Sequence, residues 1–431
     1  MVNLVLIDCH DLGQHLGCYG WETVPSPHLD ALAGRGVRFA NNFCTAPQCS
    51  PSRAGLYTGR YAHANGMMGL AHHPFYWRLH DDEVHLARYL RDAGYHTVQM
   101  GVQHVTDFTV EAVQQLGFAD VWIADDADTI GEHAAAFLRG QPEAPFFLNI
   151  GFFEPHRDDD GSYRYAPPDR SRGVRVPPYL PQTPEAEAEC ADLQGVIAKL
   201  DKAVGQIWSA LEESGLLAQT WFIFTVDHGL AMPRAKCTLY DPGIETALLM
   251  VGEPFGLVGG RVLDSLISNV DLVPTVLEML GIPMPERLHG QSFAALLRGV
   301  AYSPREAVFI EKTFHTDYEP QRGIRTGRYK LIWNAEVDII NVPSDIMHSL
   351  IYPQMIDQLT VERPPLELYD LEADPLEQHN RVDDPAYAPV VDDLRGRLLA
   401  WMRETSDPLL NGPVASPYNQ RALAMLRGER P

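Results

Sequence analysis

One stretch of the chain reads Cys49-Ser50-Pro51-Ser52-Arg53-Ala54-Gly55-Leu56-Tyr57-Thr58-Gly59-Arg60, a pattern typical of a loop that leads into a helix. Ser50 suits the N-cap of that helix, and Pro51 suits its first position, where no backbone N–H is needed. Cys49 would then lie just outside the positive end of the helix, with Arg53 one turn inside. A helix N-terminus and a guanidinium attract a tetrahedral anion, and here a sulfur nucleophile would lie beside it. The stretch therefore indicates sulfate or phosphate chemistry.

Short apolar runs and amphipathic helical segments alternate along the chain on both sides of this stretch. The predicted strands are residues 3–7, 96–100, 146–153, 221–226, 247–251 and 308–310. The predicted helices are residues 27–35, 82–93, 193–211 and 270–280. Strands that alternate with helices favour an α/β fold with a doubly wound, mostly parallel sheet. We assign this fold to a catalytic domain of residues 1–320.

The pattern changes near residue 321. Residues 323–333 alternate like a strand of an antiparallel hairpin, residues 366–371 predict another strand, and residues 390–403 predict a terminal helix. We therefore expect a smaller C-terminal α+β subdomain over residues 321–431. Residues 158–184 are rich in proline, glycine and charge, and predict a long loop over the site.

The composition excludes several classes of partner. A net charge of −23 argues against a nucleic-acid surface, but a small anionic substrate in a locally basic pocket remains compatible. No apolar run approaches the length of a membrane span. The N-terminus reads as a strand rather than a signal peptide, and the six cysteines are scattered, so we expect a cytoplasmic protein. The sequence leaves the oligomeric state open.

Acidic residues and histidines follow four of the predicted strands. They are Asp8, His10 and Asp11 after the first strand, then His104, His156, and the pair Asp227 and His228. Each residue alone is most often an ordinary loop residue. The carboxyl ends of strands in a doubly wound sheet converge, however, and carboxylates with imidazoles can hold a divalent cation.

The opening stretch also resembles the signature of the type I sulfatases, which belong to the alkaline-phosphatase-like superfamily. That signature is Cys-x-Pro-Ser-Arg followed by Leu-x-Thr-Gly-Arg. In this family a formylglycine-generating enzyme oxidises the cysteine to formylglycine, whose hydrate is the nucleophile. Further blocks that match in order are Asp227-His228-Gly229, Pro155-His156, His104, and Lys236 followed by Tyr240 and Gly243.

Within the family, the chain is most similar to the sulfamidases (N-sulfoglucosamine sulfohydrolases) and their bacterial relatives. The supporting stretches are His63-Ala64-Asn65-Gly66-Met67, Glu154-Pro155-His156-Arg157, Asp241-Pro242-Gly243 and Glu367-Leu368-Tyr369-Asp370 with Asn380.

The resemblance implies a set of site residues. The catalytic residues are Cys49, Arg53, His104, His156 and Lys236. The metal ligands are His10, Asp11, Cys49, Asp227 and His228, for Ca²⁺ or alternatively Mg²⁺ or Mn²⁺. Arg53 and Lys236 would hold the anion, His104 would steady the nucleophile and His156 would protonate the leaving group. Candidate substrate-binding residues are His72, His73 and His315, each of which could equally be an exposed loop histidine.

Two positions depart from the family pattern. His10-Asp11 stands where the family has Asp-Asp, and an imidazole there would favour softer divalent ions; Asp8 is an alternative ligand from the same strand. Val102 stands where the family has a lysine that contacts the sulfate. Losing that cation would weaken sulfate binding.

We interpret the chain as a metal-dependent sulfatase acting on a sulfate ester or sulfamate of a small substrate, such as a sugar. The first alternative is a phosphonate monoester or phosphodiester hydrolase of the same superfamily. The second is a non-catalytic binder of sulfated ligands, although a binder has no need of the modification signal around Cys49.

Overall fold

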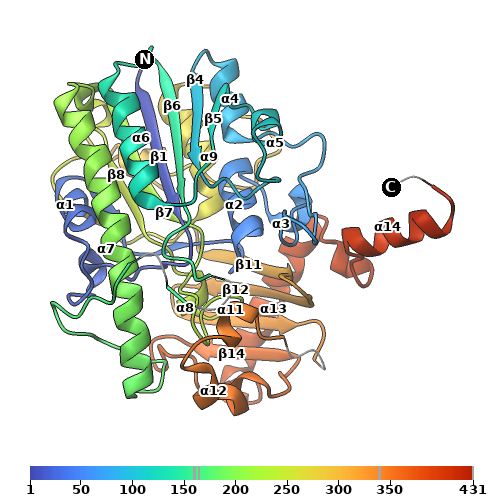
Figure 1. Ribbon diagram of the computed structural model, residues 1–431. Helices are drawn as coiled ribbons and strands as arrows, with labels where there is room; N and C mark the ends of the chain where they lie inside the picture. The colour runs from blue at the N-terminus through green and yellow to red at the C-terminus, as the bar shows by residue number, and fades with distance from the viewer. Residues whose placement is uncertain (159–161, 164–165, 338–340, 430–431) are drawn as a thin grey trace.

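The computed structural model describes residues 1–158, 162–163, 166–337 and 341–429, and shows a large and a small sheet, one above the other in the view of Figure 1. The large sheet has eight strands in the order β5-β4-β6-β1-β7-β8-β2-β9. Their bounds are β1 (Asn3–Cys9), β2 (Val37–Phe39), β4 (His96–Gly101), β5 (Asp120–Trp122), β6 (Phe146–Phe152), β7 (Thr220–Val226), β8 (Leu248–Val251) and β9 (Arg261–Leu263). Only β8 is antiparallel to its neighbours among these strands. The predicted mostly parallel sheet is confirmed.

Helices cover both faces of the large sheet, because its central strands are apolar on both sides. In β1, Val5 and Ile7 pack on one face and Leu4 and Leu6 on the other, all fully buried. The helices on the first face are α1 (Pro27–Arg35), α6 (Ala127–Arg139) and α7 (Pro184–Glu213). Those on the second face are α2 (Cys49–Thr58), α4 (Leu86–Asp92) and α9 (Leu272–Leu280). This two-sided cover confirms the doubly wound fold.

The small sheet is antiparallel, with the order β11-β12-β13-β14. Its strands are β11 (Ala307–Phe314), β12 (Tyr318–Thr326), β13 (Tyr329–Asn334) and β14 (Leu366–Asp370), and α13 (Ala388–Glu404) packs on it through Leu394, Leu398 and Trp401. We predicted residues 308–310 as a strand of the parallel sheet, and this is wrong because they belong to β11. The boundary expected at residues 320 and 321 thus falls inside β12, the second strand of the small sheet. The division into two domains stays a prediction.

The remaining elements are short and connect or flank the sheets. They are β3 (Asn42–Phe43), β10 (Ile267–Ser268), α3 (Ala62–Asn65), α5 (Val110–Gln115), α8 (Asp241–Ile244), α10 (Ala294–Leu297), α11 (Ser344–Met347), α12 (Tyr352–Leu359) and α14 (Pro417–Leu426).

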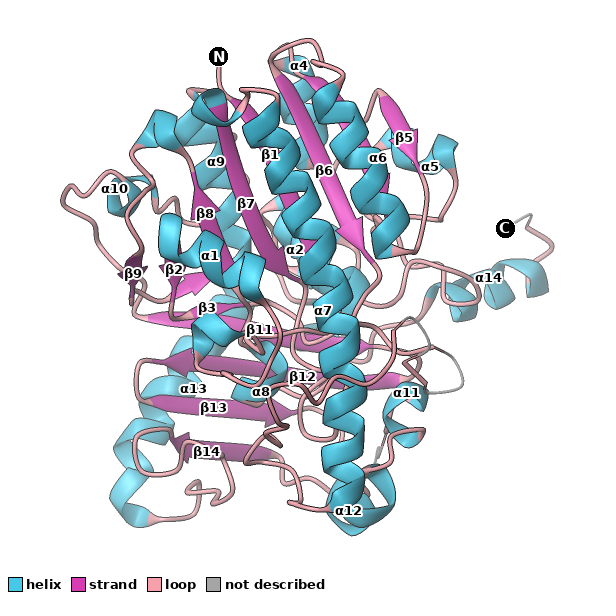
Figure 2. Cartoon of the chain, turned by 60° about the vertical axis from the view of Figure 1, so that its left-hand side comes forward, coloured by secondary structure: helices cyan, strands magenta, loops and turns pink. Residues whose placement is uncertain are grey.

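Helix α7 is longer than its apolar pattern predicts. It begins at Pro184, where the Thr183 hydroxyl accepts a hydrogen bond from the Ala186 N–H, and it runs beside both sheets (Figure 2). Its first turns carry a buried glutamate, Glu189, where an apolar residue would have extended the periodic pattern. Between β6 and α7 the described residues form no helix or strand beyond one isolated bridge; residues 159–161 and 164–165 of the predicted loop lie outside the described part.

A buried ion pair fastens the end of the chain to the small sheet. Arg322 on β12 is fully buried, and its guanidinium donates to both oxygens of Asp407 at 2.5 and 3.0 Å. A buried charge that loses its partner destabilises a fold far more than an exposed one does. The pair therefore stabilises the segment that follows α13.

We predict that Asp407→Asn lowers the free energy of unfolding by about 3 kcal/mol. The Arg322 guanidinium keeps its charge but loses its nearer carboxylate, and only Glu311 Oε2 at 3.7 Å remains among the described residues. Urea denaturation measures the change. The control is Asp392→Asn, which breaks an exposed pair with Arg395 on α13 and should change stability by less than about 0.5 kcal/mol. Equal losses in the two variants would contradict the assignment.

Candidate active site

Helix α2 begins at Cys49, so the cysteine lies in its first turn. The N-cap is Gln48, whose side-chain amide donates to the Phe314 carbonyl at 3.1 Å. The predicted N-cap at Ser50 is wrong, because the Ser50 hydroxyl instead accepts a hydrogen bond from the Ala71 N–H at 3.1 Å. Cys49 is fully enclosed, with 1% of its surface exposed.

Arg53 joins α2 to the ends of β1 and β7. Its guanidinium pairs with Asp8, and its Nε donates to Asp227 Oδ2 at 3.2 Å. Asp8 also accepts a hydrogen bond from the Tyr57 hydroxyl. Burial raises the pKa of Asp8 to about 6, although Arg53 and Tyr57 lower it. Asp8 thus acts as the counter-ion of Arg53, with both oxygens engaged by α2.

Asp11 and His228 place two acceptor atoms against each other. His228 Nδ1 lies 3.0 Å from the Gly229 carbonyl, so it carries the proton and leaves a lone pair on Nε2. That Nε2 lies 3.1 Å from Asp11 Oδ1 and 3.3 Å from Cys49 Sγ. Among the described residues, Asp11 Oδ1 has no hydrogen-bond donor. Lone pairs that face each other in a buried site fit a shared cation.

His10 and Asp227 extend this cluster. His10 Nδ1 lies 3.2 Å from Asp227 Oδ2, and within the described part of the chain neither ring nitrogen of His10 has a hydrogen-bond partner. Asp227 Oδ1 accepts from the backbone N–H groups of Asp11 and His228 at 3.0 and 2.8 Å. Donor atoms of Asp11, Cys49, Asp227 and His228 lie within 4.8 Å of one another, as do those of His10, Asp11, Cys49 and His156. The donor set fits a divalent cation.

Lys236 is the ammonium group of the site, and three acceptors surround it. Its Nζ lies 2.9 Å from Asp11 Oδ2, 2.7 Å from Asp345 Oδ2 and 3.1 Å from His156 Nε2. Burial lowers the pKa of Lys236, but Asp11 and Asp345 outweigh it and hold the pKa well above its ordinary value. The group therefore stays charged and can balance an anion.

Asp345 is a site residue that our sequence analysis missed. It lies on α11, and Ser349 just beyond that helix donates to Glu189 of α7 at 2.7 Å. Glu189 in turn pairs with Arg157, the neighbour of His156. Burial raises the pKa of Asp345, but Lys236 reverses this and holds it below the usual range. No local signal marks Asp345, since Pro343-Ser344-Asp345 reads as an ordinary helix start.

The remaining predicted histidines lie in different surroundings. His104 is buried and its Nε2 lies 3.0 Å from His72 Nδ1; burial and His72 hold its pKa well below the ordinary value, so the ring is neutral. For His315, burial and then the charge of Lys236 lower the pKa to about 3. His73 is exposed and its ring contacts Tyr76 at 5.4 Å between centroids.

Val102, the second departure from the family pattern, is buried at the end of β4. It is 5% exposed, and its N–H donates to the Gly151 carbonyl at 2.8 Å. Two other cations pair with carboxylates of the donor cluster: Arg53 with Asp227 and Lys236 with Asp11.

The fold that carries this site is that of the alkaline-phosphatase-like hydrolases. A 2-O GAG sulfatase superposes with a TM-score of 0.76 at 22% identity, covering 96% of this chain and 95% of that one. Phosphonate monoester hydrolase of Agrobacterium radiobacter superposes with a TM-score of 0.72 at 22% identity, covering 95% and 97%. At these identities the likeness concerns the fold.

Sequence comparison identifies the family. The family model described as Sulfatase matches residues 3–282, and the model described as N-sulphoglucosamine sulphohydrolase, C-terminal, matches residues 229–343. Human N-sulphoglucosamine sulphohydrolase is 30% identical, with 95% of this chain and 92% of the human protein covered. The chain therefore belongs to the sulfatase family of sulfuric ester hydrolases, as the signature at Cys49 predicted. Within the described ranges, no helix has both the length and the apolar character to cross a bilayer.

We predict that Asp227→Asn and Asp8→Asn differ in bound metal. Each leaves Arg53 short of one carboxylate, so the two variants are matched for that loss. Only Asp227 belongs to the donor cluster, so Asp227→Asn should lower metal affinity by about 100-fold or more, together with the rate. Elemental analysis after dialysis measures the difference; equal metal loss in Asp8→Asn would make Asp8 a ligand.

Proposed function

We propose that this sulfatase hydrolyses a sulfate ester or sulfamate on a small sugar, with formylglycine made from Cys49 as its nucleophile. The observation that carries the proposal is the position of Cys49 in the first turn of α2, with Sγ 3.3 Å from His228 Nε2 in the donor cluster. Burial holds the pKa of the thiol well above its ordinary value, although Lys236 lowers it. An unmodified Cys49 would therefore be a protonated, weak nucleophile at neutral pH. Oxidation by a formylglycine-generating enzyme removes this obstacle.

The residues around Cys49 suit this reaction. Formylglycine would supply a hydroxyl group for attack on sulfur, and a divalent cation would supply Lewis-acid stabilisation of the anion. Asp11, Asp227 and His228 would hold the cation, together with His10. We propose Ca²⁺, with Mg²⁺ or Mn²⁺ as alternatives; the two imidazoles raise the relative affinity for Mn²⁺.

Acid–base and anion-binding roles fall to the remaining groups. Lys236 would balance the charge of the sulfate, and Arg53 would hold Asp227 and the α2 N-terminus in register. His156 places Nδ1 against the Arg157 carbonyl, so its Nε2 faces the Lys236 ammonium group. Once protonated, this Nε2 would pass a proton to the leaving group. His104 Nδ1 is buried and has no hydrogen-bond partner among the described residues. It can therefore form a hydrogen bond with a hydroxyl of the formylglycine hydrate at position 49.

The substrate proposal rests on the human relative, whose name gives N-sulphoglucosamine as its substrate. For this chain we propose a small sulfated amino sugar as the substrate. Its candidate contacts are His72, which lies beside His104, and His315, whose pKa is lowered by Lys236. His73 remains a candidate at the exposed edge. The cytoplasmic location also remains a prediction.

We predict that protein co-expressed with a formylglycine-generating enzyme has lost one sulfur and two hydrogens and gained one oxygen at Cys49. Cys49→Ala should then abolish release of sulfate from an aryl sulfate, because no nucleophile remains. Peptide mass spectrometry and steady-state rates are the measurements. The control is Cys190→Ala on α7, which removes another buried cysteine and should keep the activity. Turnover by Cys49→Ala would refute the nucleophile assignment.

The second candidate function is hydrolysis of a phosphonate monoester. It is favoured by Val102, because the site lacks the second lysine that contacts sulfate in the family, and by the fold of the phosphonate monoester hydrolase. Sulfate and phosphonate esters are similar in size and geometry, so direct rates must separate them.

We predict that Val102→Lys raises kcat/KM on nitrophenyl sulfate by about tenfold, the effect of one added charge-assisted hydrogen bond. Val102→Met is the control for a longer side chain without charge. The measurement compares nitrophenyl sulfate with a nitrophenyl phosphonate ester. Faster turnover of the phosphonate by the wild type, with a Val102→Lys gain on that ester alone, would favour the second candidate.

A further inference from the structure

A cavity of about 390 Å³ lies where the residues that follow β1 and the residues that follow β14 meet helix α8. Two side chains that can ionise, His15 and Glu245, line it. Apolar and aromatic side chains form much of the remaining wall, namely those of Leu12, Trp21, Tyr179, Leu230 and Leu376. A concave site of this size, with apolar walls and a few polar groups, is typical of small-molecule binding.

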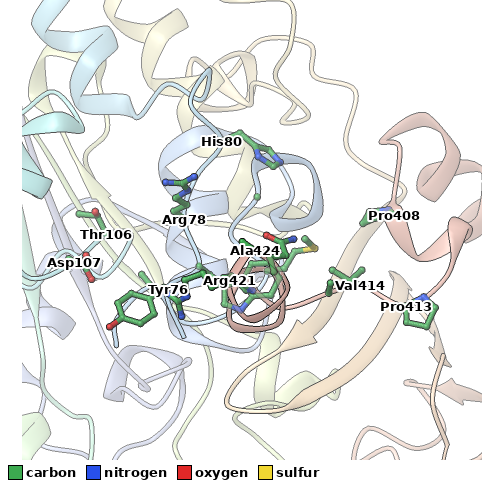
Figure 3. Close-up of a pocket in the computed structure, with 17 residues that line it drawn as sticks. Tyr76, Arg78, His80, Thr106, Asp107, Pro408, Pro413, Val414, Arg421 and Ala424 are labelled. Carbon is green, nitrogen blue, oxygen red and sulfur yellow. The ribbon is translucent and has the colours of Figure 1, made fainter. Parts of the chain in front are cut away.

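A larger cavity, of about 880 Å³, lies between α14 and residues 66–80 (Figure 3). Its side chains Arg78 and His80 are exposed, so water can satisfy them. Among the described residues that line it, none has a buried polar atom without a hydrogen-bond partner. The smaller cavity differs in this respect, because a buried polar side chain without a partner lines it.

That side chain is His15, whose imidazole ring is held against Trp21. His15 is 3% exposed, and neither Nδ1 nor Nε2 has a hydrogen-bond partner in the part of the chain that the structure describes. Burial and then the charge of Arg175 lower its pKa to about 3, so the ring is neutral and keeps one lone pair. The Trp21 ring lies 4.3 Å away between centroids and also contacts the Arg175 guanidinium at 4.8 Å. The imidazole therefore offers an acceptor to a ligand that carries a hydrogen-bond donor.

Glu245 is a carboxyl group of the cavity that has no cation beside it. Arg325 donates to the two oxygens of Asp241 at 3.4 and 3.0 Å. Lys330 Nζ lies 2.6 Å from Asp241 Oδ1 and 2.6 Å from Glu377 Oε1. These two cations thus balance two carboxylates, those of Asp241 and Glu377. The side chain of Glu245 forms no hydrogen bond or ion pair with any described residue, so it is the third carboxyl group beside two cations.

The charged groups around Glu245 keep it protonated while no further cation is present. Burial and then Asp241 raise its pKa to about 8, and Glu377 adds to this, although Arg325 and Lys330 lower the pKa. The free carboxyl group is therefore largely neutral at pH 7. A ligand cation beside it would favour the ionised form and supply the missing positive charge.

We propose that this cavity binds a small organic cation, an ammonium group carried on an apolar or aromatic body. Glu245 pairs with the ammonium group, and His15 accepts a second hydrogen bond from it. Trp21 and Tyr179 pack against the body of the ligand. The net charge of −23 on the whole chain attracts a cation to this site. The ligand is distinct from the anionic substrate, and the site is separate from the donor cluster around Cys49.

The test is isothermal titration calorimetry of the full chain with three probes of similar size. They are 2-phenylethylammonium, the neutral 2-phenylethanol and the anionic phenylacetate. We expect the wild type to bind the ammonium probe about tenfold more tightly than either of the others, because only this probe forms a charge-assisted contact with Glu245. Glu245→Gln, which keeps the size of the side chain, should abolish the preference. His15→Phe, which keeps a ring against Trp21, should weaken binding of the ammonium probe by about tenfold.

The matched control is Glu372→Gln. Glu372 also lines the cavity, but it is exposed and its Oε2 lies 3.4 Å from Arg328 Nε, so its charge already has a partner. This variant should keep the preference for the ammonium probe.

A second measurement uses the wild type alone and so does not depend on the folding of a variant. With a pKa of about 8, Glu245 is roughly 90% protonated at pH 7 in the free protein, and the ion pair with the probe ionises it. Binding of 2-phenylethylammonium should therefore release close to one proton, and its affinity should rise with pH up to about 8. Titrations in buffers of different ionisation enthalpy measure this proton, and 2-phenylethanol should release none.

Three outcomes would overturn the cation site. The first is a wild type that fails to bind the ammonium probe at millimolar concentration, or binds it no more tightly than the alcohol or phenylacetate. The second is a preference for the ammonium probe that persists in Glu245→Gln. The third is binding of the ammonium probe without release of a proton. All three are measured without turnover, so none of them affects the sulfatase assignment.

Discussion

The guanidinium of Arg53, buried between Asp8 and Asp227, holds the start of α2 against the ends of two central strands. Taking this cation out of water is unfavourable, and only two carboxylates at fixed positions offset it. Burial lowers the pKa of Arg53, but Asp8 and Asp227 more than offset this and hold the pKa above its ordinary value. The guanidinium therefore stays charged. Because the register of α2 is fixed in this way, Cys49 has one position relative to Asp11 and His228.

The same pairing separates the roles of the two acidic residues in and just after β1, Asp8 and Asp11. Asp8 lies deeper in β1 and is engaged by Arg53 and Tyr57. Asp11, three residues further on, adopts a left-handed backbone conformation with φ 49° and leaves Oδ1 without a donor among the described residues. A cation site needs free lone pairs. Asp8 thus serves as a counter-ion within β1, whereas Asp11, just after the strand, keeps a free oxygen in the donor cluster.

The sequence predicted the large sheet well because its strands are buried on both faces. β1, β6 and β7 read as continuous apolar runs, and their length and spacing predict a parallel core. An apolar run of three residues carries no information about which sheet it joins, which is why residues 308–310 were misplaced. The first turns of α7 were missed for a different reason. Glu189 is buried there because it pairs with Arg157, so a charged residue stands where the helical pattern predicts an apolar one.

The site was predictable only where a residue follows a strand or belongs to a signature. His10, Asp11, Asp227 and His228 meet because parallel strands end at one edge. The N-cap at Gln48 depends on the Phe314 carbonyl, which lies at the end of β11 in the other sheet. Asp345 likewise reaches Lys236 only because Ser349 and Glu189 fasten α11 to α7. Contacts between segments so far apart in the chain produce no periodic pattern in the sequence from which they could be predicted.

These contacts have a consequence for how the two sheets act together. The Lys236 ammonium group lies between two carboxylates, those of Asp11 and Asp345. Asp11 follows β1 of the large sheet, and Asp345 belongs to the segment of the chain that connects β13 to β14 of the small sheet. The charge around Lys236 is therefore set jointly by both parts of the chain. A displacement of α11 would remove one counter-ion from Lys236 and strengthen its attraction for an anion, whereas loss of Asp11 would also remove an oxygen atom from the donor cluster. The part of the chain that forms the small sheet thus contributes one of the two carboxylates that surround the Lys236 ammonium group.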